Sequence, residues 1–340
     1  MLHVLYVLEA NIGGARRHRR DLVAGGAAAG HRVTVVLSFG RDPLAHEEDL
    51  PFYSRFGVRV VELPMRRAIS PFADLTAWWK LRSLIRREKP DIVHAHSSKA
   101  GALARLACAG SGIPVVYTPH VFPFLMQDAS PLYRHFERRA IARTAAVVCV
   151  TRQEAEAAVQ LGYPSERVAH IPNGIDPSEA AEPETERLSK AAFFGRECPQ
   201  KGTDWLRETG IECDFHTAYR PGEALAWMRR YSLILMPSRW EGCPYTLLEA
   251  WAAGTPVAAT PVGGLAEMIR DGENGILLPM DAECWRCEIP RLLADRNQLR
   301  RLARNAREDL SSYTLNTMRD QTLALYQRVH SNPRLKISRR

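Results

Sequence analysis

The feature that most constrains this chain is the regular alternation of short apolar runs with segments of helical length over its 340 residues. Each run has the length of one strand, and such alternation is typical of parallel sheets whose strands are joined by helices. The length exceeds that of one ordinary core and suits two α/β domains. The pattern predicts strands at His3–Leu8, Arg32–Ser38, Val58–Glu62, Asp91–Ala95, Val115–Thr118, Ala146–Val150, Val168–Ile171, Ala191–Gly195, Cys213–His216, Leu233–Pro237, Pro256–Thr260 and Gly275–Leu278.

A change of composition indicates where the two domains meet. Asp176–Lys190 is acidic and polar, contains two prolines and has no apolar period, so we interpret residues 176–190 as a linker. It separates an N-terminal domain at 1–175 from a C-terminal domain at 191–314. Residues 315–340 are expected to form a helix that can pack back on the N-terminal domain, followed by a frayed basic tail at Arg334–Arg340. Open parallel sheets bind ligands beyond the carboxyl ends of their strands, so two of them predict a central cleft.

Composition narrows the class of partner. The net charge is +8 and the pI about 9.3, which favours an anionic partner. Basic clusters lack regularly spaced aromatic residues, so we expect no nucleic acid, and an anionic membrane surface or a phosphorylated substrate remains. The segment Trp78-Trp79-Lys80-Leu81-Arg82 suits peripheral membrane contact, although both tryptophans could equally be core residues.

The same numbers predict a compartment. No apolar run approaches the roughly 18 residues of a spanning helix, and the N-terminus lacks the features of a signal peptide. Seven scattered cysteines indicate reduced thiols. A cytoplasmic protein is expected, peripheral on the inner face of the membrane at most. Cys284-Trp285-Arg286-Cys287 is a single CxxC without a second pair, so two helical thiols are favoured over a zinc site.

In the first half, polar residues follow the expected strands. Gly13-Gly14 lies between a strand and a helix, where it is either a plain tight turn or a close approach for an anion. The basic run Arg16–Arg20 in the first helical turns is either a solvated face or a sign of a nearby anion. His94 and His96 share one strand face, but metal ligation lacks a third nearby ligand in the sequence. His120 follows a strand end, where a histidine can be structural or functional.

In the second half, charged residues follow strand ends at close spacing. Arg196 and Lys201 are placed to converge on a pyrophosphate, with two ordinary surface cations as the alternative. Glu241 precedes a Gly-x-Pro turn that should open a helix, and Glu249 lies about two turns further on. A carboxylate that accepts from two vicinal hydroxyls is a natural anchor for a sugar diol. Neither glutamate has a helical salt-bridge partner four residues on.

Together these residues resemble the retaining glycosyltransferases of family 4, especially those that build bacterial capsular and exopolysaccharides. The resemblance covers nearly the whole chain, and its specificity lies in the order and spacing of motifs that are weak singly. The motifs are Gly13-Gly14 with His18, His94-Ala95-His96-Ser97-Ser98-Lys99-Ala100-Gly101, Tyr117-Thr118-Pro119-His120, Ile171-Pro172-Asn173-Gly174-Ile175-Asp176, Gly195-Arg196 with Lys201-Gly202, Glu241 with Glu249, Gly263-Gly264 and Asp271-Gly272-Glu273-Asn274-Gly275.

The resemblance implies an α/β protein of the GT-B fold, with two Rossmann-like domains that face a central cleft. It implies transfer of a hexose from a nucleotide-diphosphate sugar, UDP-linked, to a lipid-linked or other glycan by front-face attack, with no enzymic nucleophile, cofactor or metal. Catalytic roles fall on His120, Glu241, Arg196 and Lys201. Donor and nucleotide contacts fall on Gly13, Gly14, Arg196, Lys201, Glu241, Gly242, Cys243, Pro244, Tyr245, Thr246 and Glu249, and acceptor-side contacts on His18, His96, Ser97 and Lys99.

One departure from the family concerns the C-terminal domain. Only 36 residues separate Lys201 from Ser238, where the family usually carries a helix, a glycine-ended strand, another helix and a base-contacting loop. A βα unit is therefore expected to be missing, with Phe215–Arg220 as the remnant of the loop, and the domain is shortened. The alternatives to an active transferase are a non-catalytic subunit of the same fold and a sugar-nucleotide epimerase.

Overall fold

A computed structural model of the chain describes residues 1–40, 42, 44–126, 131–180, 187–217 and 223–332. The chain divides into two compact units, Met1–Ile171 with Arg319–Arg340, and Pro172–Met318. Of the expected linker, residues 181–186 lie outside the described residues, and so does the basic tail. Every predicted strand is present, with ends that shift by at most three residues.

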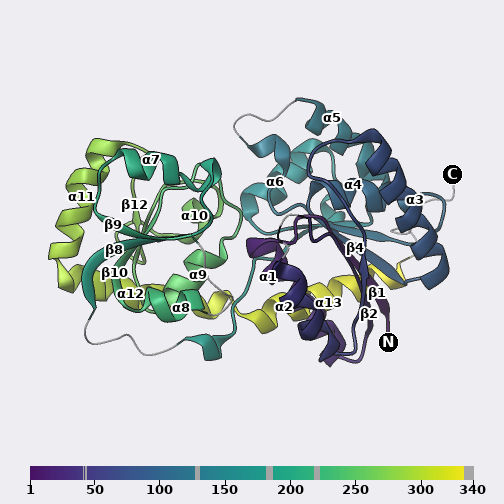
Figure 1. Ribbon diagram of the computed structural model, residues 1–340, viewed down its shortest axis with the longest axis horizontal. Coiled ribbons are helices and arrows are strands. Elements are labelled where there is room, and N and C mark those ends of the chain that lie inside the picture. Colours follow the sequence, from purple (N-terminus) through teal and green to yellow (C-terminus); the bar gives the residue numbers. More distant parts are fainter. Residues whose placement is uncertain (41, 43, 127–130, 181–186, 218–222, 333–340) are drawn as a thin grey trace. The chain divides into compact units, whose positions relative to one another are not determined.

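The first unit is built on a seven-stranded sheet in the order β3-β2-β1-β4-β5-β6-β7, with every pairing parallel (Figure 1). Its strands are β1 (His3–Leu8), β2 (Arg32–Leu37), β3 (Arg59–Glu62), β4 (Ile92–His96), β5 (Val115–Thr118), β6 (Ala146–Cys149) and β7 (Val168–His170). Its helices are α1 (Gly13–Ala28), α2 (Leu44–Ser54), α3 (Pro71–Glu88), α4 (Ser98–Ala107), α5 (Pro131–Ala140), α6 (Arg152–Leu161) and most of α13 (Leu315–Ser331).

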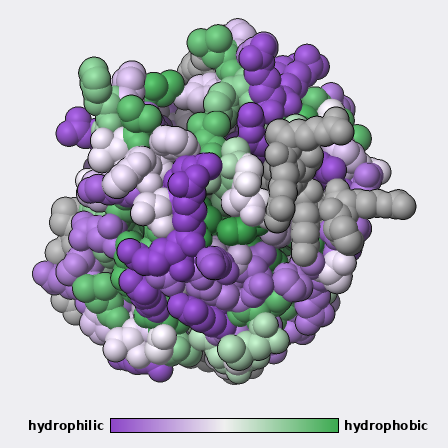
Figure 2. Space-filling view, turned by 90° about the vertical axis from the view of Figure 1, so that its right-hand side faces the viewer, coloured by the Kyte–Doolittle hydropathy of each residue, from purple (hydrophilic) through white to green (hydrophobic). Residues whose placement is uncertain are grey.

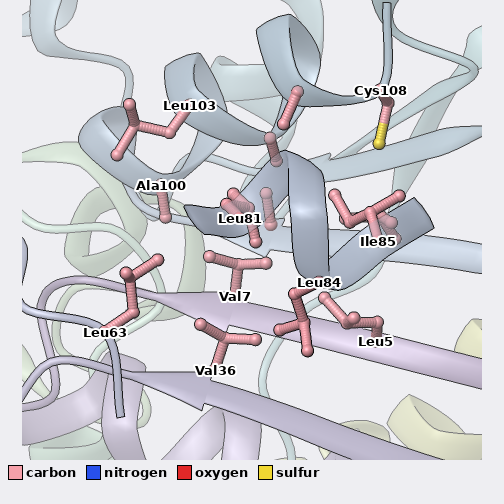
Figure 3. Packing of buried hydrophobic residues seen from close by; sticks show 14 of the residues in the cluster. Leu5, Val7, Val36, Leu63, Leu81, Leu84, Ile85, Ala100, Leu103 and Cys108 are labelled. Atoms are coloured by element: carbon pink, nitrogen blue, oxygen red, sulfur yellow. The ribbon is translucent and has the colours of Figure 1, made fainter. Parts of the chain in front are cut away.

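The direction of the connections decides which face each helix covers. From β1 the chain moves outward through β2 to β3, then returns to β4 and continues to β7. Since parallel crossovers are right-handed, α1 and α2 cover one face and α3 to α6 the other. Alternate residues of β1 confirm this division: Leu5 and Val7 belong to the core beneath α3 and α4, which Figure 3 shows, whereas the hydroxyl of Tyr6 meets that of Tyr326 on α13.

The second unit is a five-stranded parallel sheet in the order β12-β11-β10-β8-β9. Its core packs Phe193 and Leu235 of the central strands against Trp285 of α11. The strands are β8 (Leu188–Phe194), β9 (Cys213–His216), β10 (Tyr231–Met236), β11 (Val257–Ala259) and β12 (Ile276–Leu277). The helices are α7 (Thr203–Glu208), α8 (Glu223–Met228), α9 (Tyr245–Ala252), α10 (Gly263–Met268), α11 (Ala282–Ala294) and α12 (Arg296–Asp309).

The short stretch between Lys201 and Ser238 contains α7, β9 and α8 in the described part of the chain. β9 pairs directly with β8 and forms the edge of the sheet. Of the expected loop remnant Phe215–Arg220, Phe215 and His216 end β9, and residues 218–220 lie outside the described residues.

Candidate functional site

In the second unit, the loops that follow β8 and β10 are joined by hydrogen bonds. The two strands are neighbours in a parallel sheet, so their carboxyl ends lie at the same edge. The amide of Arg239 donates to the carbonyl of Gln200 at 2.9 Å, and the side-chain amide of Gln200 donates to the carbonyl of Trp240 at 3.3 Å. These bonds place the short 3₁₀ turn Pro199–Lys201 directly beside the Ser238–Glu241 loop.

Lys201 and Glu241 form an ion pair at this junction. The ammonium of Lys201 lies 2.6 Å from Oε1 of Glu241, and the hydroxyl of Ser238 donates to the same oxygen at 2.7 Å. The side chains are only 14% and 6% exposed, so both charges are largely removed from water. The salt-bridge partner of Glu241 therefore comes from a neighbouring strand end rather than from its own helix.

Two glycines allow these loops to approach. A Cβ on Gly202 would lie 2.0 Å from the carbonyl oxygen of Pro237, and one on Gly263 would lie 1.9 Å from that of Glu241. Both glycines also have a left-handed backbone, with φ of +67° and +49°. The Glu241 carbonyl accepts the amide of Gly264 at 3.3 Å. Gly263-Gly264, one of the motifs that carry the family resemblance, thus supports the backbone of Glu241.

The helix expected after the Gly-x-Pro turn is α9, which begins at Tyr245 after Pro244. The carbonyl of Cys243 accepts the side-chain amide of Asn173 at 2.6 Å, which fixes the Gly242–Cys243 backbone. Burial raises the pKa of the Cys243 thiol to about 12, so the group is neutral. Thr246 and Tyr245 are buried, and Glu249 is half-buried in the second turn of the helix.

Arg196 stands apart from the ion pair. It is exposed just beyond the last residue of β8, with Gly195 between them. No ion pair to Arg196 is present among the residues that the structure describes. Its guanidinium is accordingly available to an anion.

In the first unit, α1 begins at Gly13, with Gly13 and Gly14 both exposed. The interpretation of the basic run as a sign of a bound anion is wrong for its two buried arginines. Arg16 and Arg19 bind the carboxylate of Asp49 on α2, at 2.9 Å and 3.0 Å. Burial would raise the pKa of Asp49, but these guanidinium groups hold it below its usual value. Protein carboxylates, rather than a ligand, neutralise this cluster.

Histidines from three segments converge on one point of the first unit. His18 on α1, His96 at the end of β4 and His120 beyond β5 place their ligand atoms within 4.8 Å of one another. Nδ1 of His96 lies 3.2 Å from Nε2 of His120. Burial and the neighbouring histidines lower the pKa of His96 and His120 well below 6.5, so both rings are neutral. The sequence around His96 showed no third candidate metal ligand nearby. The fold brings two further histidines, His18 and His120, to His96 from distant segments.

His94 has a different role from its neighbour. Its two ring nitrogens are hydrogen bonded to the hydroxyls of Tyr326 at 2.5 Å and Thr118 at 2.8 Å. His94 therefore ties α13 to the sheet of the first unit.

The backbone at His120 and Val121 is strained and is held by a hydrogen bond to the side chain of Glu154. His120 and Val121 have φ of +55° and +86°, which non-glycine residues rarely adopt. The buried carboxylate of Glu154 accepts the amide of Val121 at 2.8 Å and that of Val150 at 2.9 Å. Burial raises the pKa of Glu154 to about 7, although its backbone donors act in the opposite direction.

The remaining acceptor-side residues lie at the start of α4. Ser97 has a left-handed φ of +70°, and its hydroxyl is buried without a hydrogen-bond partner. The ammonium of Lys99 binds Asp74 on α3 at 2.7 Å and also donates to the carbonyl of Ala68. In this state Lys99 anchors the first turn of α3.

Sequence reasoning missed several supporting residues, namely Asp49, Glu154, Asn173 and Ser238. Asn173 lies in a motif that the resemblance had marked, and Ser238 directly follows a predicted strand, so weak signals existed for both. Asp49 and Glu154 lie on helices and are recognisable only once those helices are packed.

Comparisons with known proteins agree with this architecture. The sequence model described as Glycosyltransferase Family 4 matches residues 12–179, and that described as Glycosyl transferases group 1 matches residues 193–295. The chain is 26% identical to the UDP-Gal:alpha-D-GlcNAc-diphosphoundecaprenol alpha-1,3-galactosyltransferase of Escherichia coli, over 63% of this chain and 69% of that protein. It is 30% identical to the D-inositol 3-phosphate glycosyltransferase of Xylanimonas cellulosilytica, over 64% and 67%.

Among solved structures, HepE of Anabaena in complex with UDP and glucose matches with a TM-score of 0.80. The match covers 96% of this chain and 100% of that chain at 18% identity, which establishes a common fold.

Proposed function

Since this chain belongs to the family 4 glycosyltransferases and has their GT-B fold, we propose that it moves a hexose from a UDP-sugar to a lipid-linked glycan, with retention of anomeric configuration. The names of two relatives support the substrates. The Escherichia coli protein uses UDP-Gal and a diphosphoundecaprenol-linked acceptor, and the Anabaena structure contains UDP and glucose. Such a reaction belongs to surface polysaccharide biosynthesis.

The observation that carries the proposal is the Lys201–Glu241 pair. A cation and a carboxylate, both largely buried and 2.6 Å apart, lie beside the turn that opens α9. A nucleotide-diphosphate sugar offers a partner to each: phosphate oxygens to the ammonium and sugar hydroxyls to the carboxylate. Arg196 adds a second cation for the diphosphate, and Glu249 is the proposed ribose anchor.

The proposed reaction needs no nucleophile from the protein. The bond between C1 of the sugar and the phosphate oxygen breaks while an acceptor hydroxyl attacks C1 from the same face. The proton of that hydroxyl passes to the departing phosphate oxygen, which leaves UDP. Lys201 and Arg196 neutralise the charge that develops on the diphosphate, without a metal ion.

In the first unit we assign the other contacts by the same reasoning. His120, neutral and half-buried, is proposed to hydrogen bond the donor sugar, and Gly13 and Gly14 offer backbone amides at the start of α1 to the diphosphate. His18, His96, Ser97 and Lys99 form the proposed acceptor side. Of these, Ser97 has a buried hydroxyl without a hydrogen-bond partner among the described residues. Lys99 would have to break its ion pair with Asp74 before it could contact an acceptor.

A panel of UDP-sugars with a polyprenyl-diphosphate-linked acceptor tests the activity by the release of UDP and the configuration of the product. Lys201→Met should lower kcat about 10²- to 10³-fold, because a preorganised charge on the leaving group is lost. Lys190→Met is the matched control, since Lys190 is 46% exposed and its ion pairs in the described part of the chain are with the exposed acids Glu212 and Asp214. Intact donor across the panel, with UDP still bound, would indicate a binding subunit, and an interconverted donor without acceptor would indicate an epimerase.

We further propose that the first unit contacts an anionic membrane, where a lipid-linked acceptor would lie. On α3, Phe72, Leu75 and Trp79 are exposed at 87%, 61% and 65%, and their spacing places them on one side of the helix. Lys80, Arg86 and Arg87 of the same helix are also exposed. Trp79 is thus a surface residue, whereas Trp78 packs against the core.

A second helix on the same face of the sheet repeats this composition. α5 exposes Leu132, Tyr133 and Phe136 beside Arg138 and Arg139, and its single acid, Glu137, is buried against Arg105. In Figure 2, hydrophobic and hydrophilic side chains lie interspersed on the side of the molecule where α3 lies in Figure 1. Apolar side chains can enter the membrane interface, and each basic side chain near anionic headgroups contributes about 1 kcal/mol to binding. This combination favours binding to the surface of an anionic bilayer.

Cosedimentation with phosphatidylglycerol and phosphatidylcholine vesicles tests this contact. The protein should bind only the anionic vesicles, less so at high salt, and Phe72→Ser with Trp79→Ser should weaken binding. Val159→Ser is the control, because Val159 is an exposed apolar residue of α6 outside both helices. Equal binding by the double variant would refute the assignment. No helix among the residues that the structure describes is long and apolar enough to span a membrane.

A further inference from the structure

The three converging histidines of the first unit have the chemistry of a metal site. Three imidazoles from α1, β4 and the loop after β5 present ligand atoms within 4.8 Å of one another. Their ring centroids are 4.8 to 5.5 Å apart. The convergence follows from the fold, since β1, which leads into α1, and β4 and β5 are successive strands of the sheet.

The state of the rings suits ligation. A metal binds an imidazole through a ring nitrogen, and the ring nitrogens of all three histidines approach one another closely at this point of the fold. Nδ1 of His96 is the ring nitrogen that faces His120, 3.2 Å from its Nε2, and Nε2 of His96 is buried without a hydrogen-bond partner among the described residues. His94 lies beside His96 but has both nitrogens engaged with hydroxyls, so the ligand set is His18, His96 and His120.

We propose that His18, His96 and His120 bind one first-row transition-metal dication of the Zn²⁺ type. Tetrahedral zinc with Zn–N distances of about 2.0–2.1 Å has ligand nitrogens about 3.4 Å apart. The 3.2 Å between Nδ1 of His96 and Nε2 of His120 already fits, and the remaining separations, which are within 4.8 Å, must shorten by up to about 1.4 Å when the ion binds. Three imidazoles without oxygen ligands select Zn²⁺, Cu²⁺, Ni²⁺ or Co²⁺ over Mg²⁺ and Ca²⁺.

The consequence for activity rests on the proposed function, in which His120 hydrogen bonds the donor sugar. A metal that occupies the ring nitrogen of His120 removes that contact. The metal and the donor sugar therefore compete, and the bound ion inhibits transfer rather than supporting it.

Titration with Co²⁺ in the absence of donor and acceptor tests the site independently of turnover. We expect one equivalent to produce the visible absorption of tetrahedral Co²⁺, without the charge-transfer band of a thiolate that ligation by Cys284 or Cys287 would give. Zn²⁺ should displace it, and a large excess of Mg²⁺ should not. His120→Asn should weaken binding at least about tenfold, since even loss of an outer-shell partner costs 10- to 100-fold. Asparagine is chosen because it tolerates the left-handed backbone at this position.

His18→Gln is the second ligand variant, and His135→Gln is the control, because His135 is an exposed histidine on α5. Circular dichroism establishes which variants fold, and His120→Asn decides the matter if buried His18 cannot be replaced. A spectrum that stays that of the hydrated ion, or binding that is equal in wild type and His120→Asn, would overturn the site. Transfer that is undiminished with Co²⁺ bound would overturn the competition alone, and absent transfer with a normal Co²⁺ titration would leave the site intact and refute the proposed activity.

Discussion

Replacement of Gly263 by alanine tests whether the backbone of Glu241 depends on this glycine. The new Cβ would lie 1.9 Å from the Glu241 carbonyl oxygen and 3.0 Å from its carbonyl carbon. Ordinary contact is at least 3.4 Å, so the two backbones must separate by about 1.5 Å. Because the contact is with backbone rather than with a flexible side chain, we expect the Glu241 backbone to shift and to disturb the contacts of its carboxylate with Lys201 and Ser238.

Two terms set the expected loss of stability. Alanine in a left-handed conformation costs about 1–2 kcal/mol, and a steric overlap in a packed region costs about 1–3 kcal/mol more. The sum, about 2–5 kcal/mol, corresponds to a fall in Tm of about 4–20 °C for a unit of this size. Gly272→Ala isolates the first term, because Gly272 has φ of +73° and nothing within 4 Å of the added Cβ.

Differential scanning calorimetry and titration with UDP-sugar of both variants supply the comparison. Gly263→Ala should lose at least about 1 kcal/mol more than Gly272→Ala and should bind UDP-sugar more weakly at temperatures where both are folded. Equal Tm values for the two variants would show that the close approach to Glu241 is unimportant. Unchanged donor affinity in Gly263→Ala would show that the carboxylate is not held by this contact.

Three further predictions follow from buried groups. In the folded protein the pKa of Glu154 is raised from 4.5 to about 7. Protonation of Glu154 therefore contributes to the free energy of unfolding fully below pH 4.5, and this contribution is lost as the pH rises through 7. Urea unfolding should therefore show wild type losing up to about 1.4 kcal/mol per pH unit relative to Glu154→Gln in this window. Arg105→Ala should cost about 3–5 kcal/mol by leaving Glu137 buried and unpaired, and the added change Glu137→Leu should recover part of it in the same assay. A thiol reagent should modify exposed Cys287 rapidly and buried Cys243, whose pKa is about 12, only on unfolding, as mass spectrometry of the labelled cysteines would show.

The central strands could be predicted from sequence because they are buried on both faces and read as continuous apolar runs. β1 and β5 have the predicted bounds for this reason. The helix after Pro244 was predictable from local turn chemistry. These signals are carried by neighbouring residues and need no knowledge of how strands are ordered in the sheet.

The pairings inside the site depend on that order and could not be predicted. Lys201 meets Glu241 because β8 and β10 are adjacent although β9 lies between them in sequence. Likewise, the partner of Arg16 and Arg19 is Asp49 on α2, where no local pattern marks it as a buried counter-ion. The family resemblance predicted the candidate residues of the site, whereas their contacts became known only from the order of the strands in the sheet.

If the second unit binds a sugar nucleotide as proposed, the ion pair formed by Lys201 and Glu241 also influences which anions bind well. A free phosphate that binds Lys201 leaves the carboxylate of Glu241 with Ser238 alone, in a setting where an unpaired charge is expensive. A sugar nucleotide replaces both lost partners at once, with phosphate for the ammonium and hydroxyls for the carboxylate. Under the proposed function, inorganic phosphate is therefore expected to bind more weakly than a sugar nucleotide, because only the sugar nucleotide replaces both partners of the ion pair.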